Sequence, residues 1–449
     1  MNKTLSCCVL SAQVMLGVIA ASHAAPQPGE VYLELYEYPG TSDTGGWRVT
    51  DPAATAADAQ LYLPNKWHTI TIPTGALAGA TRVEAMLERW MGHPGSREKR
   101  LKFNSDTMTN PWIDVPQLTA VSDSDSSMAM DNPVVTVPVT QLREGTNRID
   151  FYCNGDGDWG QWGEYGTMLR IYYNPAAKAH ATGSITSPSA NATIGDSAAI
   201  TVEGTPPPGG SVSQVNVIGY YEGYDENGDN ITTEWHEFYH RPRSQSVHLA
   251  ITGHIGSDTS PPYSVTWDNA QVPSQAGMKM LARIKDSSGI WCVTSEVTGL
   301  TLAHSNYNIK LYRAGPSIPA PLWDPWGTKK CSVNIPAADN ISSAEEVRIL
   351  WKTWASHDAD FSINGTVIGK SGGSNHEYSL TTRTFNKSVL TSGNNTILSR
   401  YVSPDGGAHH GVEMLLPGPV IVAKYYRGAM PSVTLTVPTN HAVFSAPAN

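Results

Sequence analysis

The chain has 449 residues, of which only 16% are Asp, Glu, Lys or Arg, against about 25% in an average soluble protein. Its 40 Gly, 31 Pro and 13 Trp suit short strands joined by tight turns better than long charged helices. The net charge of −10 argues against a nucleic-acid partner, because phosphate binding needs a concentrated basic face.

A signal peptide is predicted over residues 1–24. Lys3 gives a basic start, residues 7–21 are mostly apolar, and Ser22 and Ala24 are the small residues that a signal peptidase requires. The apolar run is too short to span a bilayer, and no later segment reaches that length. We therefore expect a secreted protein, periplasmic or extracellular, with no membrane anchor.

Two regions of the sequence repeat one another and predict two copies of one module, 26–178 and 306–428. The markers recur in the same order. They are Val83 and Val347, Trp90 and Trp354, His93 and His357, Asn104 and Asn364, Gly145 and Gly393, and the closing pairs Tyr172–Tyr173 and Tyr425–Tyr426. Each copy is expected to form a jelly-roll-like β-sandwich.

The first repeated block is ambiguous when it is taken alone. Residues 83–91 fit a helix, whereas 347–354 contain Trp and Thr and alternate between apolar and polar residues. Because the two blocks are equivalent, we predict a strand for both.

A different unit, 182–302, separates the repeats, and its short alternating runs predict an immunoglobulin-like sandwich. Residues 431–449 echo the opening of that unit and predict either the start of a further immunoglobulin-like module or a disordered tail. Cys153, Cys292 and Cys331 fall one in each predicted domain, so buried thiols are expected rather than disulfides. The predicted fold class is all-β, with two jelly-roll-like modules flanking the immunoglobulin-like domain.

His236, Glu237 and His240 match the H-E-x-x-H pattern, in which two histidines on one helical face bind zinc. Turn residues upstream and Pro242 downstream leave no room for that helix. On a strand, histidines four residues apart lie about 13 Å from each other. A zinc hydrolase is therefore a remote alternative.

Asp225, Asn227 and Asp229 place oxygen atoms at alternate positions of a tight turn, as in a calcium loop. The twelfth position of that loop is His236 instead of the usual Glu. Calcium is the cofactor that this pattern predicts, and an ordinary polar turn is the alternative.

A loop rich in aromatic residues is predicted near the end of the first repeat. Trp159, Trp162 and Tyr165 accompany Glu164 there, and rings with a carboxylate suit sugar recognition. Trp67, Trp112 and His93 are expected to extend this surface. The alternative is that some of these rings fill the end of the sandwich.

The second repeat has a different set of residues in the corresponding place. His357, His410 and Glu413 could together bind a metal ion or abstract a proton. A purely structural role for the recurring histidine is the alternative. A basic patch around Lys99 and Arg100 could contact an acidic polysaccharide.

This layout resembles modular secreted proteins of polysaccharide-degrading bacteria, in which galactose-binding-like or carbohydrate-binding sandwiches alternate with immunoglobulin-like spacers. The resemblance rests on the module order, the Trp-rich loop and the module openings, and it implies a polysaccharide or glycan partner. Two functions follow as expectations. The first is a secreted polysaccharide-binding protein, and the second is a polysaccharide-cleaving enzyme, a lyase or hydrolase, that uses His357, His410 and Glu413.

Overall fold

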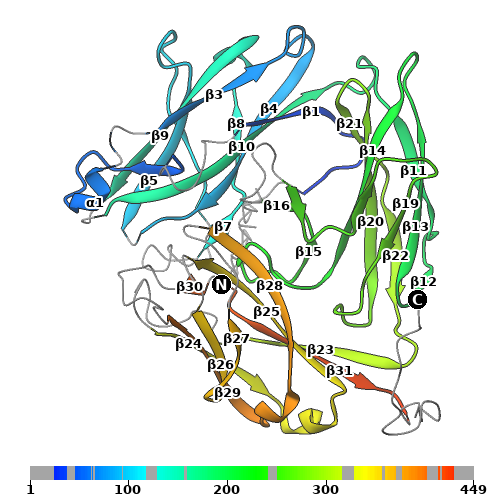
Figure 1. Cartoon of the computed structure of the whole chain (residues 1–449). Coiled ribbons are helices and arrows are strands. Elements are labelled where there is room, and N and C mark those ends of the chain that lie inside the picture. Colours follow the sequence, from blue (N-terminus) through cyan, green and yellow to red (C-terminus); the bar gives the residue numbers. More distant parts are fainter. Residues whose placement is uncertain are drawn as a thin grey trace, which may run out of the picture.

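The computed structural model describes residues 25–37, 46–61, 63, 66–93, 95–117, 129–155, 159–240, 250–315, 328–355, 359–370, 377–401, 413–414 and 417–428. Within these ranges nearly all regular structure is β-strand, and the single α-helix is the one-turn α1 (Ala57–Gln60). Figure 1 shows three groups of strands. No described helix has the length and apolar character needed to cross a membrane.

The first sandwich has two facing sheets. The strands of one are β1 (Val31–Glu37), β2 (Arg48–Thr50), β4 (Ala80–Trp90), β7 (Met130–Asp131), β8 (Val134–Val137) and β10 (Gln161–Tyr173). Those of the other are β3 (Trp67–Ile72), β5 (Ser96–Phe103), β6 (Ile113–Asp114) and β9 (Gly145–Gly155), in the order β3-β9-β5-β6. Alternation of exposed and buried residues along β3 explains why this segment forms a strand with one face in the core.

The second sandwich contains a larger and a smaller sheet. The larger has β12 (Thr193–Ile194), β14 (Val212–Glu222), β15 (Thr233–Trp235), β18 (Gly256–Asp258), β20 (Gln275–Asp286), β21 (Ile290–Val293) and β22 (Val297–Leu302). The smaller has β11 (Thr182–Ser187), β13 (Ala198–Thr205) and β19 (Ser264–Trp267). A separate hairpin consists of β16 (Phe238–His240) and β17 (Ala250–Thr252).

The third sandwich again pairs two sheets. One has β23 (Tyr307–Arg313), β25 (Glu346–Ala355), β28 (Glu377–Phe385), β30 (Glu413–Met414) and β31 (Val420–Tyr426). The other has β24 (Thr328–Ile335), β26 (Ala359–Ile363), β27 (Thr366–Lys370) and β29 (Gly393–Tyr401). Short 3-10 turns precede β9 and β29, at Val139–Gln141 and Lys387–Val389, and two more occur at Ala337–Asp339 and Ile341–Ser343.

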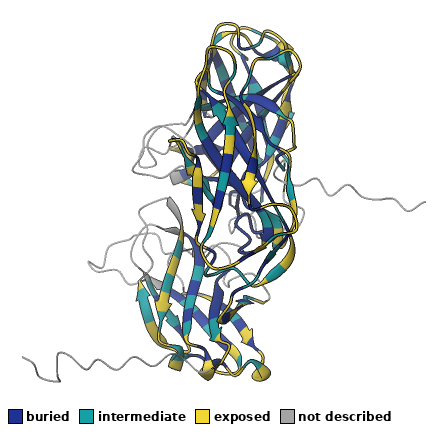
Figure 2. Ribbon diagram, turned by 90° about the vertical axis from the view of Figure 1, so that its right-hand side faces the viewer, coloured by how far each residue is buried: buried dark blue, intermediate teal, exposed yellow. Residues whose placement is uncertain are grey.

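Each sandwich has its own cluster of buried apolar side chains. Ile149 and Leu169 represent the first cluster, Val217 and Ile284 the second, and Ile349 the third. Figure 2 shows buried residues along the strands and exposed residues mainly at the turns. Cys153, Cys292 and Cys331 are free and buried, as expected.

The first two sandwiches are joined through their strands. β1 pairs with β21 in antiparallel fashion, Val31 opposite Cys292, so one sheet runs from the first sandwich into the second. The β16–β17 hairpin also docks on the first sandwich, where the Asn132 amide nitrogen donates to the carbonyl oxygens of Leu87 and Tyr239 at 3.0 and 2.9 Å. As a result, every residue of β10 is buried.

One hydrogen-bond arrangement occurs in both the first and the third sandwich. The amide nitrogen of Asn104 donates to Asn147 Oδ1 at 2.9 Å, and that of Asn364 donates to Asn395 Oδ1 at 2.8 Å. Asn104 and Asn364 have φ angles of 52° and 50°, a left-handed conformation that Asn tolerates. The Asn markers of the sequence thus occupy matching turns.

The predicted all-β fold class, built from several sandwiches, is confirmed. The two repeated blocks are strands β4 and β25, so the strand prediction for both is confirmed as well. The domain boundaries stay predictions. The predicted signal peptide, 1–24, and the tail, 431–449, lie outside the described residues.

Candidate functional site

The outer face of the β3-β9-β5-β6 sheet has the features of a binding surface. Along β9, Ile149 and Phe151 are buried in the core, whereas Arg148, Asp150 and Tyr152 alternate with them and are only partly buried. The strand period of two therefore directs the polar and aromatic side chains of β9 to the opposite face. We call this face, with its neighbours on β3, β5 and the segment before β6, the β9 face.

Two exposed tryptophans lie on the β9 face, each beside a cation. Trp67 is 51% exposed, and the Arg148 guanidinium lies 4.5 Å from its ring centroid. Trp112 is 38% exposed, and Lys102 Nζ lies 4.3 Å from its ring. Tyr152 lies 5.5 Å from Trp112, so the two rings form a continuous aromatic surface.

An open groove of about 600 Å³ runs along the same face. Its lining includes Trp112, Tyr152, Lys102, Arg148, Asp150 and Ser105. Asp150 is held by Arg148 at 2.7 Å and by the Ser105 hydroxyl, which donates at 2.5 Å. The groove thus combines aromatic rings with fixed charged and hydroxyl groups, a combination that can pack on a sugar ring and hydrogen-bond its hydroxyls.

The aromatic residues predicted to bind sugar at the end of the first repeat lie elsewhere. Trp162 is fully buried, and its indole nitrogen donates to the Tyr152 carbonyl at 3.0 Å. Tyr165 is 5% exposed and stacks on Trp47 at 5.1 Å. Both residues belong to β10, which is covered on both faces, so they fill the interior instead of presenting rings to a ligand.

Trp159 and His93 lie together at one end of β10. Their rings are 5.1 Å apart, and His93 also contacts the edge of Trp90 at 5.0 Å. His93 is 5% exposed, and Trp159 is half-buried. The structure therefore brings these two predicted site residues together, but next to the core.

Glu164 is also buried, in a charged cluster beneath the β9 face. Its carboxylate forms an ion pair with Lys66, accepts from Thr167 Oγ1 at 2.8 Å and lies 3.6 Å from His68 Nδ1. Burial alone raises the pKa of Glu164, but Lys66 and His68 outweigh burial, and the pKa lies below its ordinary value. Burial lowers the pKa of His68 to about 4, against the opposing effect of Glu164.

The predicted calcium loop has the geometry of a capped turn. Asp225 accepts hydrogen bonds from the backbone N–H groups of Gly228 at 2.7 Å and Asn230 at 2.9 Å, one on each carboxylate oxygen. Asp229 Oδ1 accepts from the Ile231 N–H at 2.8 Å, and Asn227 Oδ1 from the Asp229 N–H at 2.9 Å. These bonds favour the polar turn, and calcium binding there stays a prediction.

The H-E-x-x-H residues do not converge on one point. His236 Nδ1 lies 3.0 Å from Glu226, His240 Nδ1 lies 2.6 Å from Glu88, and Glu237 pairs with Arg283 at 2.6 Å. The segment is extended, so its side chains reach different partners. Among the described residues, no group of three or more His, Cys, Asp or Glu side chains is placed to hold a metal ion.

Of the cluster predicted in the third sandwich, His357 and His410 lie outside the described residues. Glu413 belongs to β30 and pairs with Trp354 of β25. The enzymatic role of these three residues stays a prediction.

The sequence predicts only part of the aromatic and charged surface of the β9 face. Trp67 and Trp112 belong to the predicted sugar-binding surface, whereas the prediction does not include Tyr152, Arg148 or Lys102. The alternation of buried and exposed positions along 145–155 is the pattern that could have identified the residues of this strand that lie on the β9 face. Lys99 of the predicted basic patch is buried and donates to the Ser96 carbonyl, whereas Arg100 lies beside Tyr152.

Comparisons with known proteins give little further guidance. No family model and no curated protein matches the sequence. A solved beta-porphyranase of glycoside hydrolase family 86 from the human gut bacterium Bacteroides plebeius matches 51% of this chain at 11% identity, with a TM-score of 0.21. Fibronectin(III)-like modules of Clostridium thermocellum CbhA match 55% at 18% identity, with a TM-score of 0.16. The matches cover 35% of the porphyranase and 93% of the module chain, and at these TM-scores neither supports an argument.

Proposed function

We propose that this chain is a secreted polysaccharide-binding protein and that its first sandwich binds the glycan along the β9 face. The observation that carries the proposal is the exposed Trp112 ring beside the groove, with Tyr152 at 5.5 Å and Lys102 at 4.3 Å. Aromatic rings pack on the C–H faces of sugars, while nearby polar groups fix their orientation.

The charges on the β9 face favour an acidic polysaccharide over a neutral one. Arg148 is paired with Asp150 and Arg100 with Asp114, at 2.7 and 2.8 Å. Lys102 has no carboxylate partner among the described residues, so it is the cation that is available to bind a carboxylate or sulfate of the ligand. Since this interaction is exposed, we expect it to weaken as salt rises.

Affinity electrophoresis tests the proposal with polygalacturonate or alginate in the gel, and with a neutral glucan in a parallel gel. We expect the wild-type chain to be retarded by an acidic polymer and the Trp112→Ala variant to migrate freely. Tyr426→Ala is the matched control, because Tyr426 is also 38% exposed and has Lys424 5.8 Å from its ring, but lies in the third sandwich. Equal retardation of wild type and Trp112→Ala would contradict the proposal.

A further inference from the structure

The strand register of the β9 face places four of its residues in one row across the sheet. Trp67 of β3 lies opposite Asp150 of β9, and Asp150 lies opposite Lys102 of β5. The register of β5 with β6, continued by one residue, places Trp112 opposite Lys102. Residues directly opposite one another in a sheet point to the same face. The cross-strand row on the β9 face is therefore Trp67, Asp150, Lys102 and Trp112.

The two tryptophans lie at opposite ends of this cross-strand row. The strand order is β3-β9-β5-β6, so the row runs from one edge strand of the sheet to the other. Because neighbouring strands are about 4.8 Å apart, the backbones at Trp67 and Trp112 are about 14 Å apart. A sugar ring lengthens a polysaccharide by roughly one strand spacing, so a single sugar unit cannot contact both tryptophans.

Between the tryptophans, the row holds one carboxylate that is already neutralised and one cation that is available. Asp150 forms an ion pair with Arg148 at 2.7 Å and accepts from the Ser105 hydroxyl at 2.5 Å. Lys102 has no carboxylate partner among the described residues and lies 4.3 Å from the Trp112 ring. An acidic sugar over the middle of the row therefore finds hydrogen-bonding groups and a positive charge.

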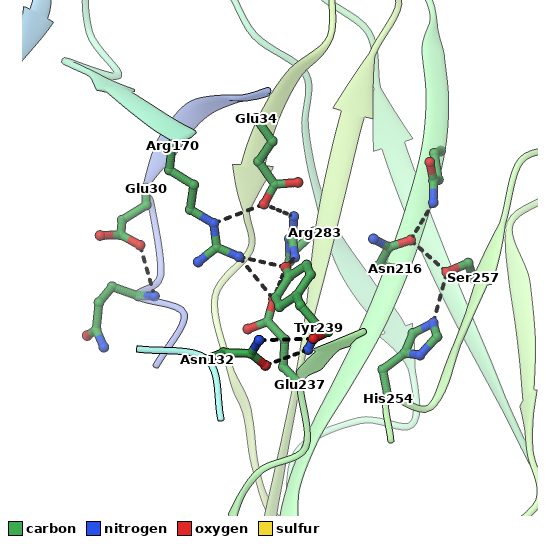
Figure 3. A network of polar contacts seen from close by, with 12 residues as sticks. Glu30, Glu34, Asn132, Arg170, Asn216, Glu237, Tyr239, His254, Ser257 and Arg283 are labelled. Atoms are coloured by element: carbon green, nitrogen blue, oxygen red, sulfur yellow. Dashed lines mark hydrogen bonds and ion pairs between the residues drawn. The ribbon is translucent and has the colours of Figure 1, made fainter. Parts of the chain in front are cut away.

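The other sheet of the first sandwich uses its outer face to contact the second sandwich, as Figure 3 shows. Glu34 of β1 and Arg170 of β10 are buried there, and Glu34 Oε1 accepts from Arg170 at 2.9 Å and from Arg283 of the second sandwich at 2.5 Å. Arg283 also pairs with Glu237 at 2.6 Å. We call these four residues the Glu34 network. Because this network occupies the outer face of that sheet, an extended ligand on the first sandwich is left with the β9 face.

We propose that the β9 face binds a stretch of about four sugar units that lies across the strands, because about three strand spacings separate its two tryptophans. One unit packs on Trp67 and another on Trp112, and Lys102 binds the acidic group of a unit between them. This inference rests on the proposed function and adds the length and direction of the bound ligand. Once one tryptophan holds the oligosaccharide, contact with the other becomes intramolecular and raises the affinity.

Isothermal titration of the full chain with oligomers of one to six units tests the inference. The oligomers are galacturonates, or alginate oligomers where alginate is the polymer that retards the chain in the gel. We expect the affinity to rise at least tenfold from the dimer to the tetramer, which corresponds to about 1.4 kcal/mol, and to change little beyond it. The dimer reaches one tryptophan, whereas the tetramer reaches both.

Trp67→Ala distinguishes loss of the second ring contact from a general defect. This variant should bind the tetramer about tenfold more weakly than wild type and bind the dimer equally well. The dimer is expected at Trp112, since Lys102 there is available whereas Arg148 beside Trp67 is paired with Asp150. Trp112→Ala should weaken binding of both oligomers. Trp67→Phe keeps a ring and should restore most of the tetramer affinity.

Tyr426→Ala is again the control, because Tyr426 is an exposed ring on the third sandwich, and it should bind every oligomer as wild type does. Equal affinities for dimer and hexamer, or a Trp67→Ala variant whose tetramer binding is unchanged, would overturn this inference. In either case the proposed function still stands if the polymer retards wild type but not Trp112→Ala. If neither acidic polymer retards wild type, the proposed function and this inference fail together.

Discussion

At the scale of single residues, a buried ion pair lies behind the β9 face. Lys66 and Glu164 form an ion pair with side-chain exposures of 5% and 0%, directly beneath the groove that Lys66 also lines. A buried pair of this kind adds little net stability, but removing one partner leaves an uncompensated charge in the interior. The pair therefore fixes the position of β3 and β10 behind the groove.

Lys66→Met should lower the free energy of unfolding by about 3–5 kcal/mol, because Glu164 would be left buried without its cation. Urea unfolding followed by fluorescence measures the loss. Adding Glu164→Gln to Lys66→Met should restore part of it, since the double variant has no buried charge there. A Lys66→Met variant as stable as wild type would show that the carboxylate is solvated in solution.

His68 should make the first sandwich less stable in acid. Its pKa is about 4 in the folded chain and about 6.5 when unfolded, so the unfolded state binds more protons between those values. The free energy of unfolding therefore falls as pH drops from about 6.5 to about 4, by about 3 kcal/mol in all.

His68→Phe keeps a ring against Phe151, 5.2 Å away, and removes the titration. The melting temperature of this variant should depend less on pH over that window than that of wild type. If the melting temperatures of wild type and His68→Phe change with pH in parallel, His68 does not cause the loss of stability in acid.

At the scale of elements, the matching Asn turns hold the strand connections of the first and third sandwiches. Besides Asn147, the Asn104 amide bonds the Gln141 carbonyl at 3.0 Å, and its Oδ1 accepts from the Arg148 N–H at 3.1 Å. Arg148 is the residue that stacks on Trp67. The turn therefore fixes the start of the strand that presents the β9 face.

Asn104→Ala should cost about 2–4 kcal/mol, since it leaves buried polar groups unsatisfied and puts Ala at a positive φ. Asn340→Ala is the comparison for the backbone part of this cost, because Asn340 has a φ of 46° but is exposed, and its Oδ1 accepts from the exposed Ser342 hydroxyl at 2.8 Å. Thermal unfolding of both variants gives the comparison. A loss for Asn104→Ala no greater than that for Asn340→Ala would contradict the assigned role of the side chain.

At the scale of the whole molecule, the sandwiches contact one another directly, unlike modules that are separated by linkers. The first and second share strand pairing, the hairpin and the Glu34 network. Lys352 of the third sandwich is 2% exposed, and its ammonium group donates to the Glu226 carbonyl of the second and lies 4.5 Å from the Phe238 ring. Burial lowers the pKa of Lys352 to about 8.

These contacts between sandwiches explain why some features could be predicted from the sequence and others could not. The period of two and the repeated markers identified the strands and the all-β class, because these are local signals. The burial of Trp162 could not be predicted in this way, since it depends on strands and on a hairpin that are far away in the sequence. Likewise, Asn132 and Tyr239 are 107 residues apart, and no local pattern indicates their contact.

The central claim, that glycan binds on the β9 face, is tested most directly by hydroxyl-radical footprinting with and without an acidic polysaccharide. We predict that the ligand protects Trp112, Trp67 and Tyr152 from oxidation and leaves Tyr426, which is as exposed as Trp112, unchanged. Protection confined to the third sandwich, or equal oxidation of Trp112 with and without ligand, would contradict the account.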